Sequence, residues 1–153
     1  MPQKAFHMSV SRAITQPRIT SSALTGAIAG LAGGVVFGML MAMMGMLPMV
    51  AMLVRQESAI VGFAVHLVIS AFIGAVYGVV ATRLPAGWAT AVVAGMVNGV
   101  VWWVLGALIL MPLGLGMTQM VFQVGADQWM SLMGHLIYGV VTALVFVPLS
   151  RRR

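Results

Sequence analysis

The chain has no cysteine and only two acidic residues, Glu57 and Asp127, in a length of 153 residues. The missing cysteines exclude disulfides, thiolate metal sites and a cysteine nucleophile. Charge of either sign is scarce, since 7% of the residues are charged and 61% are hydrophobic. So few polar groups cannot cover the surface of a water-soluble globule. The composition therefore predicts an integral membrane protein.

The sequence also lacks the residue combinations that most enzymes use. It has no nucleophile with a paired base, no carboxylate pair within an apolar stretch, no phosphate-binding glycine loop and no zinc-protease spacing. We therefore expect no enzymatic activity. A net charge of +6 would suggest nucleic acid in a soluble chain. In a membrane protein the basic ends are better matched to anionic lipid headgroups, so we expect no nucleic-acid partner.

The sequence does contain four long apolar stretches. Crossing about 30 Å of hydrocarbon takes roughly 20 apolar residues in a helix. The predicted fold is therefore all-α with four transmembrane helices. The predicted divisions are a basic N-terminal tail at 1–23, a transmembrane domain at 24–149 with spans at 24–47, 59–82, 88–111 and 130–149, and a basic C-terminus at 150–153. In the second outer loop, QMVFQVGADQWM is predicted to lie as an interfacial helix.

The basic residues indicate the orientation of these spans. Four spans place both termini on one side, and seven of the eight cations then share that side with the RLPAG turn. These seven are Lys4, Arg12, Arg18, Arg83 and Arg151 to Arg153, whereas Arg55 lies opposite. Cytoplasmic loops carry an excess of Lys and Arg. We expect a bacterial inner-membrane protein with both termini in the cytoplasm; a transit peptide is the weaker interpretation of the N-terminal segment.

The two halves of the chain resemble each other. TGAIAGLAGGVVFGMLMA (25–42) and TAVVAGMVNGVVWWVLGA (90–107) match at a threonine, two glycines, two valines, a leucine and two alanines. This similarity suggests two duplicated helix hairpins in a parallel repeat, with His66 and His135 at equivalent positions. Chance convergence among such common residues is the alternative.

Small residues recur every four positions on one face of each span. Such faces let helix backbones approach closely inside a membrane. The residues expected to pack in this way are Gly26, Gly30, Gly34, Gly38, Gly62, Ser70, Gly74, Gly78, Gly95, Gly99 and Gly139. His66 and His135 fall on the same faces, so both imidazoles are expected to point into the bundle.

The two inward histidines have three interpretations. As helix connectors they would hydrogen-bond a facing carbonyl or hydroxyl, which is the simplest reading. As ligands they could hold a cofactor or metal between the hairpins, with haem ahead of copper. As ionisable groups they could relay protons or serve a small homo-oligomeric transporter. Of these, the sequence favours the connectors and thus no cofactor.

Methionines are concentrated in LMAMMGMLPMVAML, at the outer end of the first span. Met39, Met43 and Met46 share a helix face and could join His66 in a copper path, since thioethers suit Cu(I). However, the methionines of this run occupy all sides of the helix, which favours adaptable packing against neighbours.

Taken together, these features predict a non-catalytic accessory or structural subunit of a larger membrane assembly. Short loops, glycine faces and surfaces rich in Met, Phe and Trp suit close association with other membrane subunits or with itself. The run HLVISAFIGAVYG (66–78) resembles stretches of small bacterial membrane proteins and implies no activity. A paired-histidine cofactor protein and a transporter are the alternatives.

Overall fold

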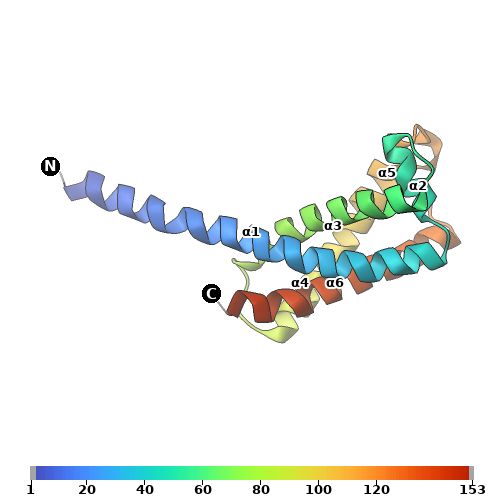
Figure 1. Cartoon of the computed structure of the whole chain (residues 1–153). Coiled ribbons are helices and arrows are strands. Elements are labelled where there is room, and N and C mark those ends of the chain that lie inside the picture. The colour runs from blue at the N-terminus through green and yellow to red at the C-terminus, as the bar shows by residue number, and fades with distance from the viewer. Residues whose placement is uncertain (1–2, 152–153) are drawn as a thin grey trace.

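The computed structural model describes the backbone of residues 3–151 and the side chains of residues 19–151. Within this part of the chain all regular secondary structure is helical. The elements are α1 (Gln3–Met43), α2 (Leu47–Ala51), η1 (Met52–Val54), α3 (Ala59–Ala81), α4 (Trp88–Trp102), η2 (Trp103–Leu110), α5 (Met111–Gly114), η3 (Thr118–Met120) and α6 (Ala126–Arg151) (Figure 1). Four helical segments are long and apolar enough to cross a membrane: Ile19–Met43, Ala59–Ala81, Trp88–Gly114 and Ala126–Arg151. The predicted all-α membrane fold is confirmed.

Helix α1 starts earlier and ends earlier than the first predicted span. Its backbone is helical from Gln3, so most of the segment expected as a tail continues the helix. The basic side chains of Lys4, Arg12 and Arg18 lie outside the described residues. The helix ends at Met43 because Gly45 adopts a left-handed φ of 68°. The amide of Gly45 donates to Ala42 O (3.1 Å) and that of Met46 to Met41 O (2.9 Å), the two bonds of a Schellman ending.

The third span continues through Pro112, where the sequence predicted its end. Proline has no amide proton, so the carbonyl four residues earlier, that of Leu108, loses its usual helical donor. In the structure the amide of Phe122 donates to Leu108 O at 3.1 Å. The stretch before the proline, η2, is π-helical rather than α-helical. The long helical segment therefore tolerates Pro112 because the following loop supplies the missing donor.

That loop differs from the interfacial helix expected for QMVFQVGADQWM. Only the short 3-10 turn η3 forms, and Phe122 takes a left-handed φ of 58° that would break a helix. α6 then begins at Ala126, so Asp127 lies in its first turn. A carboxylate in that turn faces the positive end of the helix dipole.

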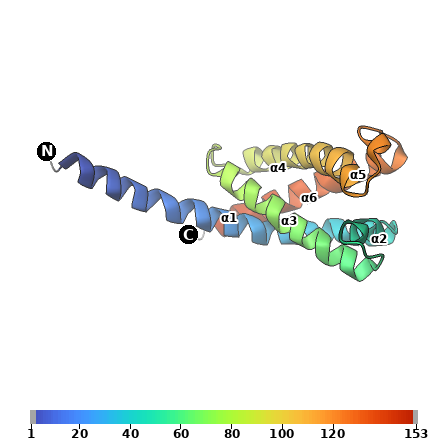
Figure 2. The ribbon, with the colours of Figure 1, turned by 90° about the horizontal axis from the view of Figure 1, so that it is seen from above.

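Helix α1 lies between α3 and α6. It packs closely against α3 along one side and against α6 along another, and α4 packs mainly against α6. Figure 2 shows α4 and α6 on one side of the bundle and α3 crossing over α1. A bundle with a true two-fold relation between the hairpins would pair α3 with α4 as closely as α1 with α6. Here α3 and α4 make far fewer contacts, so the helix arrangement departs from that symmetry.

Glycines form the closest helix contacts in both hairpins. In the first, Gly30 of α1 lies against the backbone of Ser70 and Gly74 of α3. In the second, Gly95 of α4 lies against the backbone of Gly139 of α6. The remaining stripe glycines, Gly26, Gly34, Gly38, Gly62, Gly78 and Gly99, are also buried at helix contacts.

These contacts define a register between the hairpins that differs from the one expected. Gly95 lies as many positions after Gly30 as Gly139 lies after Gly74. The two glycine contacts therefore occupy corresponding positions in the two hairpins. With the same separation in sequence, His66 of the first hairpin corresponds to Ser131 of the second, and Ser70 corresponds to His135. Each hairpin therefore has one histidine and one serine four residues apart, but in opposite order, and the two histidines are not at matching places.

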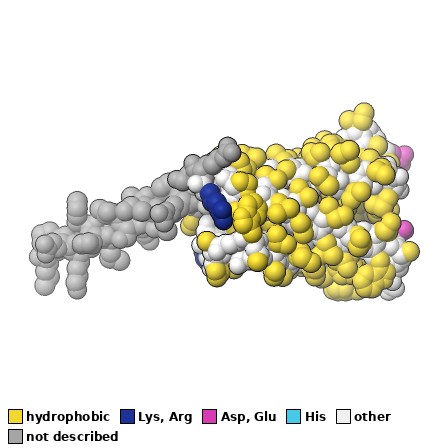
Figure 3. Space-filling view, turned by 90° about the horizontal axis from the view of Figure 1, so that it is seen from below, with side chains coloured by type: hydrophobic (Ala, Val, Ile, Leu, Met, Phe, Trp, Pro, Cys, Tyr) yellow, Lys and Arg dark blue, Asp and Glu magenta, His cyan; other side chains and the backbone are white. Residues whose placement is uncertain are grey.

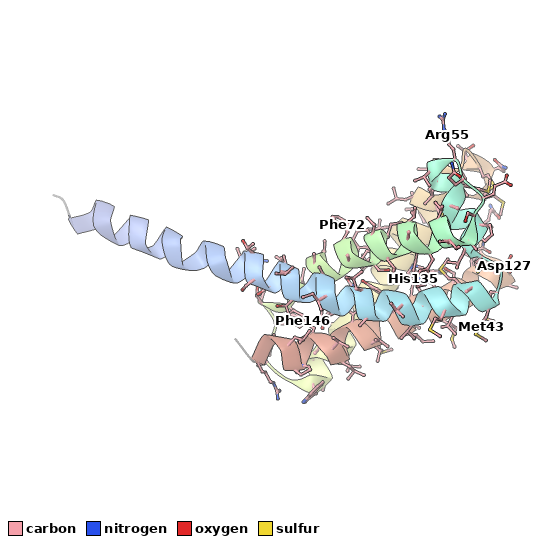
Figure 4. All side chains as sticks on the ribbon, viewed as in Figure 1. Met43, Arg55, Phe72, Asp127, His135 and Phe146 are labelled. Atoms are coloured by element: carbon pink, nitrogen blue, oxygen red, sulfur yellow. The ribbon has the colours of Figure 1, made fainter. Side chains whose placement is uncertain are left out.

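The charged residues collect at the two ends of the bundle. In the view of Figure 3, arginine side chains are seen at one end and acidic side chains at the other, with an apolar belt between them, whereas Figure 4 shows Arg55 at the same end as Asp127. Arg83 and Arg151 lie at the end where α6 finishes, and Arg151 sits over the ring of Trp88 at 5.5 Å. At the opposite end α2 folds back over α3, so Leu47, Val50 and Ala51 are buried.

Candidate functional site

His66 attaches α3 to α1. The imidazole is 8% exposed, and its Nε2 atom lies 3.0 Å from the carbonyl oxygen of Gly34 and 3.5 Å from Ser70 Oγ. A carbonyl oxygen only accepts hydrogen bonds, so Nε2 must carry the proton and donate it. The Nδ1 atom is then unprotonated, and it has no hydrogen-bond partner within residues 19–151.

His135 makes its hydrogen bonds within its own helix. Its Nδ1 atom lies 2.8 Å from Ser131 O and 3.4 Å from Ser131 Oγ. By the same argument Nδ1 donates to the carbonyl and Nε2 is unprotonated. No described residue bonds to Nε2. Each histidine thus has one bare ring nitrogen, Nδ1 in His66 and Nε2 in His135.

The ring of Phe37, on α1, contacts both imidazoles. Its centroid is 5.2 Å from that of His66 and 4.9 Å from that of His135, with interplanar angles of 86° and 64°. Gly134 provides the space, because a Cβ at that position would overlap the Phe37 ring. The structure therefore brings the two predicted histidines to the same phenyl ring, and Figure 4 shows His135 deeper in the bundle than Met43 and Asp127.

Further hydrogen bonds cross between helices near this group. Tyr138 donates from its hydroxyl to Ser70 O at 2.7 Å, which connects α6 to α3. Tyr77 donates to Ala91 O at 2.9 Å and connects α3 to α4. Two buried polar atoms, Asn98 Nδ2 and Thr142 Oγ1, have no hydrogen-bond partner in the described part of the chain.

The predicted methionine ligands do not gather at the histidines. Met39 and Met43 are 60% and 83% exposed on the outside of α1. Met46 is partly buried and packs with Leu47 and Val50 at the end of the bundle that carries α2. Within residues 19–151 there is also no group of three or more His, Asp or Glu side chains placed to hold a metal.

The bare nitrogens define what this site can do chemically. An unprotonated imidazole nitrogen can accept a proton or donate to a metal or haem iron. A group bound to both histidines at once would need the Phe37 ring to move, because that ring contacts both imidazoles. Sequence reasoning identified the histidines but missed Phe37, Gly134 and Thr142. Only Gly134, which directly precedes His135, gave a signal of close approach.

The unpartnered hydroxyl of Thr142 leads to a test of this interior. An isolated buried hydroxyl costs about 1–3 kcal/mol, and an apolar group of the same shape can be neutral or stabilising. We expect Thr142→Val to leave the free energy of unfolding unchanged or higher. Tyr138→Phe should lower it by about 0.6 kcal/mol, since it deletes a formed inter-helix bond. Unfolding in mixed micelles measures both, and a larger loss in Thr142→Val than in Tyr138→Phe would contradict the assignment.

No protein-family model, curated protein or solved structure matches the chain. The fold and its apolar belt define a small membrane protein with four spanning helices.

Proposed function

We propose that this chain is a non-catalytic accessory or structural subunit of a larger membrane assembly, in a bacterial inner membrane with both termini in the cytoplasm. The observation that carries the proposal is an exposed methionine band on the outer half of α1 and in the α2 segment. The band consists of Met39, Met43, Met44, Met49 and Met52, all exposed. Unbranched thioether side chains adapt to irregular partner surfaces.

The interior supports the same proposal. Polar side chains connect pairs of helices by donating hydrogen bonds to backbone carbonyls. These bonds run from His66 to Gly34, from Tyr138 to Ser70 and from Tyr77 to Ala91. Hydrogen bonds of this kind hold helices together where hydrophobic burial gives little driving force. A bundle held together by these hydrogen bonds can present the methionine band as a fixed surface to a neighbouring subunit.

A cysteine-free chain allows a site-specific test of the methionine band. Met43→Cys, carrying a maleimide photocrosslinker, is expected to give one discrete cross-linked product in native membranes, because Met43 faces the partner. Met130→Cys is the matched control, since Met130 is also exposed and lies near the same end on α6. A product of twice the chain mass identifies a second copy of this chain as the partner. Identical labelling patterns from both positions, or no product from Met43→Cys, would contradict the proposal.

A further inference from the structure

The end of the bundle where α6 finishes carries positive charge that no acidic side chain offsets. Arg83, in the turn after α3, and Arg151, in the last turn of α6, are both exposed. The two acids of the sequence, Glu57 and Asp127, lie at the opposite end (Figure 3). Within residues 19–151 neither guanidinium forms a hydrogen bond or an ion pair. This end can therefore bind an anion from outside the chain.

One of these arginines lies against an aromatic ring. The guanidinium carbon of Arg151 is 5.5 Å from the centroid of the Trp88 ring, so the last turn of α6 meets the first residue of α4. A cation over the face of an aromatic ring is attracted by the ring's quadrupole. That attraction restrains the guanidinium and requires none of its N–H donors. A guanidinium uses two such donors side by side to bind the oxygen atoms of a phosphate.

The residues next to the two arginines suit a lipid better than a water-soluble anion. The Trp88 ring is 46% exposed, and tryptophan is enriched at the level of the membrane headgroups. Val80 and Leu84, on either side of Arg83 in the sequence, are also exposed apolar side chains. An anionic phospholipid has a phosphate for the cations and acyl chains for these apolar neighbours.

A purely structural role for the pair of Arg151 and Trp88 explains less. The pair joins α4 to α6, but these helices already touch through their backbones at Gly95 and Gly139. Arg151 also faces the negative end of the α6 dipole, which is a favourable position for a cation. Neither role uses the N–H donors of the guanidinium.

We propose that Arg151 and Trp88 bind the phosphate group of an anionic phospholipid in the leaflet at this end of the bundle. Arg151 donates hydrogen bonds to the phosphate oxygens, and Trp88 holds the guanidinium at headgroup level. Arg83 adds positive charge at the same end. A zwitterionic headgroup carries a cation of its own, which weakens the attraction, so the site prefers a lipid with net negative charge. This site does not depend on the methionine band, which lies toward the other end of the bundle.

Spin-labelled lipids test the proposal on the full-length chain in phosphatidylcholine bilayers. Electron spin resonance measures how strongly the protein retains labelled phosphatidylglycerol relative to labelled phosphatidylcholine. Arg151→Gln is expected to lower this preference about fivefold, which is the contribution of one cation near a membrane surface. Arg55→Gln is the matched control. It removes the same charge at the opposite end, where two acids outnumber the single arginine, and should leave the preference unchanged.

Trp88→Leu distinguishes a bound headgroup from general attraction, because it retains every charge of the chain. We expect it to lower the preference about threefold, since the ring no longer restrains Arg151. Trp88→Phe keeps an aromatic face and should retain most of the preference. Trp129→Leu is the control, since Trp129 is an exposed tryptophan near the start of α6, at the other end of the bundle. It should leave the preference at the wild-type value.

Three results would overturn the proposal. Equal losses in Arg151→Gln and Arg55→Gln would show that net charge alone sets the preference. An unchanged preference in Trp88→Leu would show that the ring takes no part in binding. Release of labelled phosphatidylglycerol by inorganic phosphate as effectively as by unlabelled phosphatidylglycerol would show that the ligand is a soluble anion.

Discussion

Replacing Gly30 by leucine is expected to force α1 away from α3 and to prevent the bundle from reaching its native packing. A Cβ at Gly30 would already overlap the backbone of Ser70 and Gly74, neither of which can rotate away as a side chain would. Overpacking of a close interface typically costs about 1–3 kcal/mol, and more where backbone must move. We expect a loss of about 3 kcal/mol or more in the free energy of unfolding, measured by titration from dodecylmaltoside into SDS.

Gly106 provides the control for this substitution. It lies in η2, and a Cβ added there would meet no atom within 4 Å. Gly106→Leu is expected to change the free energy of unfolding by only about 0.5 kcal/mol, as surface substitutions usually do. Equal losses at Gly30 and Gly106 would show that the contact between α1 and α3 is not the source of the effect.

Single-cysteine labelling is expected to give nearly complete reaction at one end of the bundle and none at the other. In intact spheroplasts, a membrane-impermeant maleimide should label Ser58→Cys but reach Ala86→Cys only after permeabilisation. Both side chains are exposed, in the loop before α3 and in the turn after it. The physical reason is that the Ala86 turn lies at the basic end, which the proposed orientation places in the cytoplasm.

Replacement of serine by cysteine changes little at Ser58, which makes no side-chain capping bond to α3. Labelling after detergent solubilisation provides the control, because both cysteines should then react equally. The reverse pattern in spheroplasts would place the termini outside and would contradict the proposed orientation.

Length and composition were sufficient to predict the four spans, since the hydrocarbon thickness sets how many apolar residues a helix needs. Helix ends were less predictable because they depend on local backbone geometry. The left-handed Gly45 ends α1 before Pro48, while Pro112 is carried within a longer helical segment by the bond from Phe122 to Leu108. That second outcome depends on a residue ten positions beyond the proline, which local patterns do not reveal.

The candidate site was predictable in its residues but not in its arrangement. Helical periodicity placed His66 and His135 on inward faces. It could not place Phe37 between them, because the rotation of α1 relative to α6 is set by tertiary packing, including the space at Gly134. The predicted equivalence of the two histidines relied on their similar depth, whereas the glycine contacts define the actual register. Met39 and Met43 lie on one face of α1, as predicted, but that face points away from the bundle interior.

The position of α1 between α3 and α6 has a consequence for how the chain is assembled during synthesis. Of the four long helices, α1 is made before the others, yet one of its two main packing partners, α6, is made after the other three. Until α6 enters the bilayer, Phe37 lacks the space at Gly134 and the contact with His135. Gly95 on α4 is likewise without its neighbour, Gly139. The main contacts between the two hairpins therefore form only after α6 has been made, and a chain that stops after the third span leaves polar and glycine faces exposed, as in the species on which chaperones act.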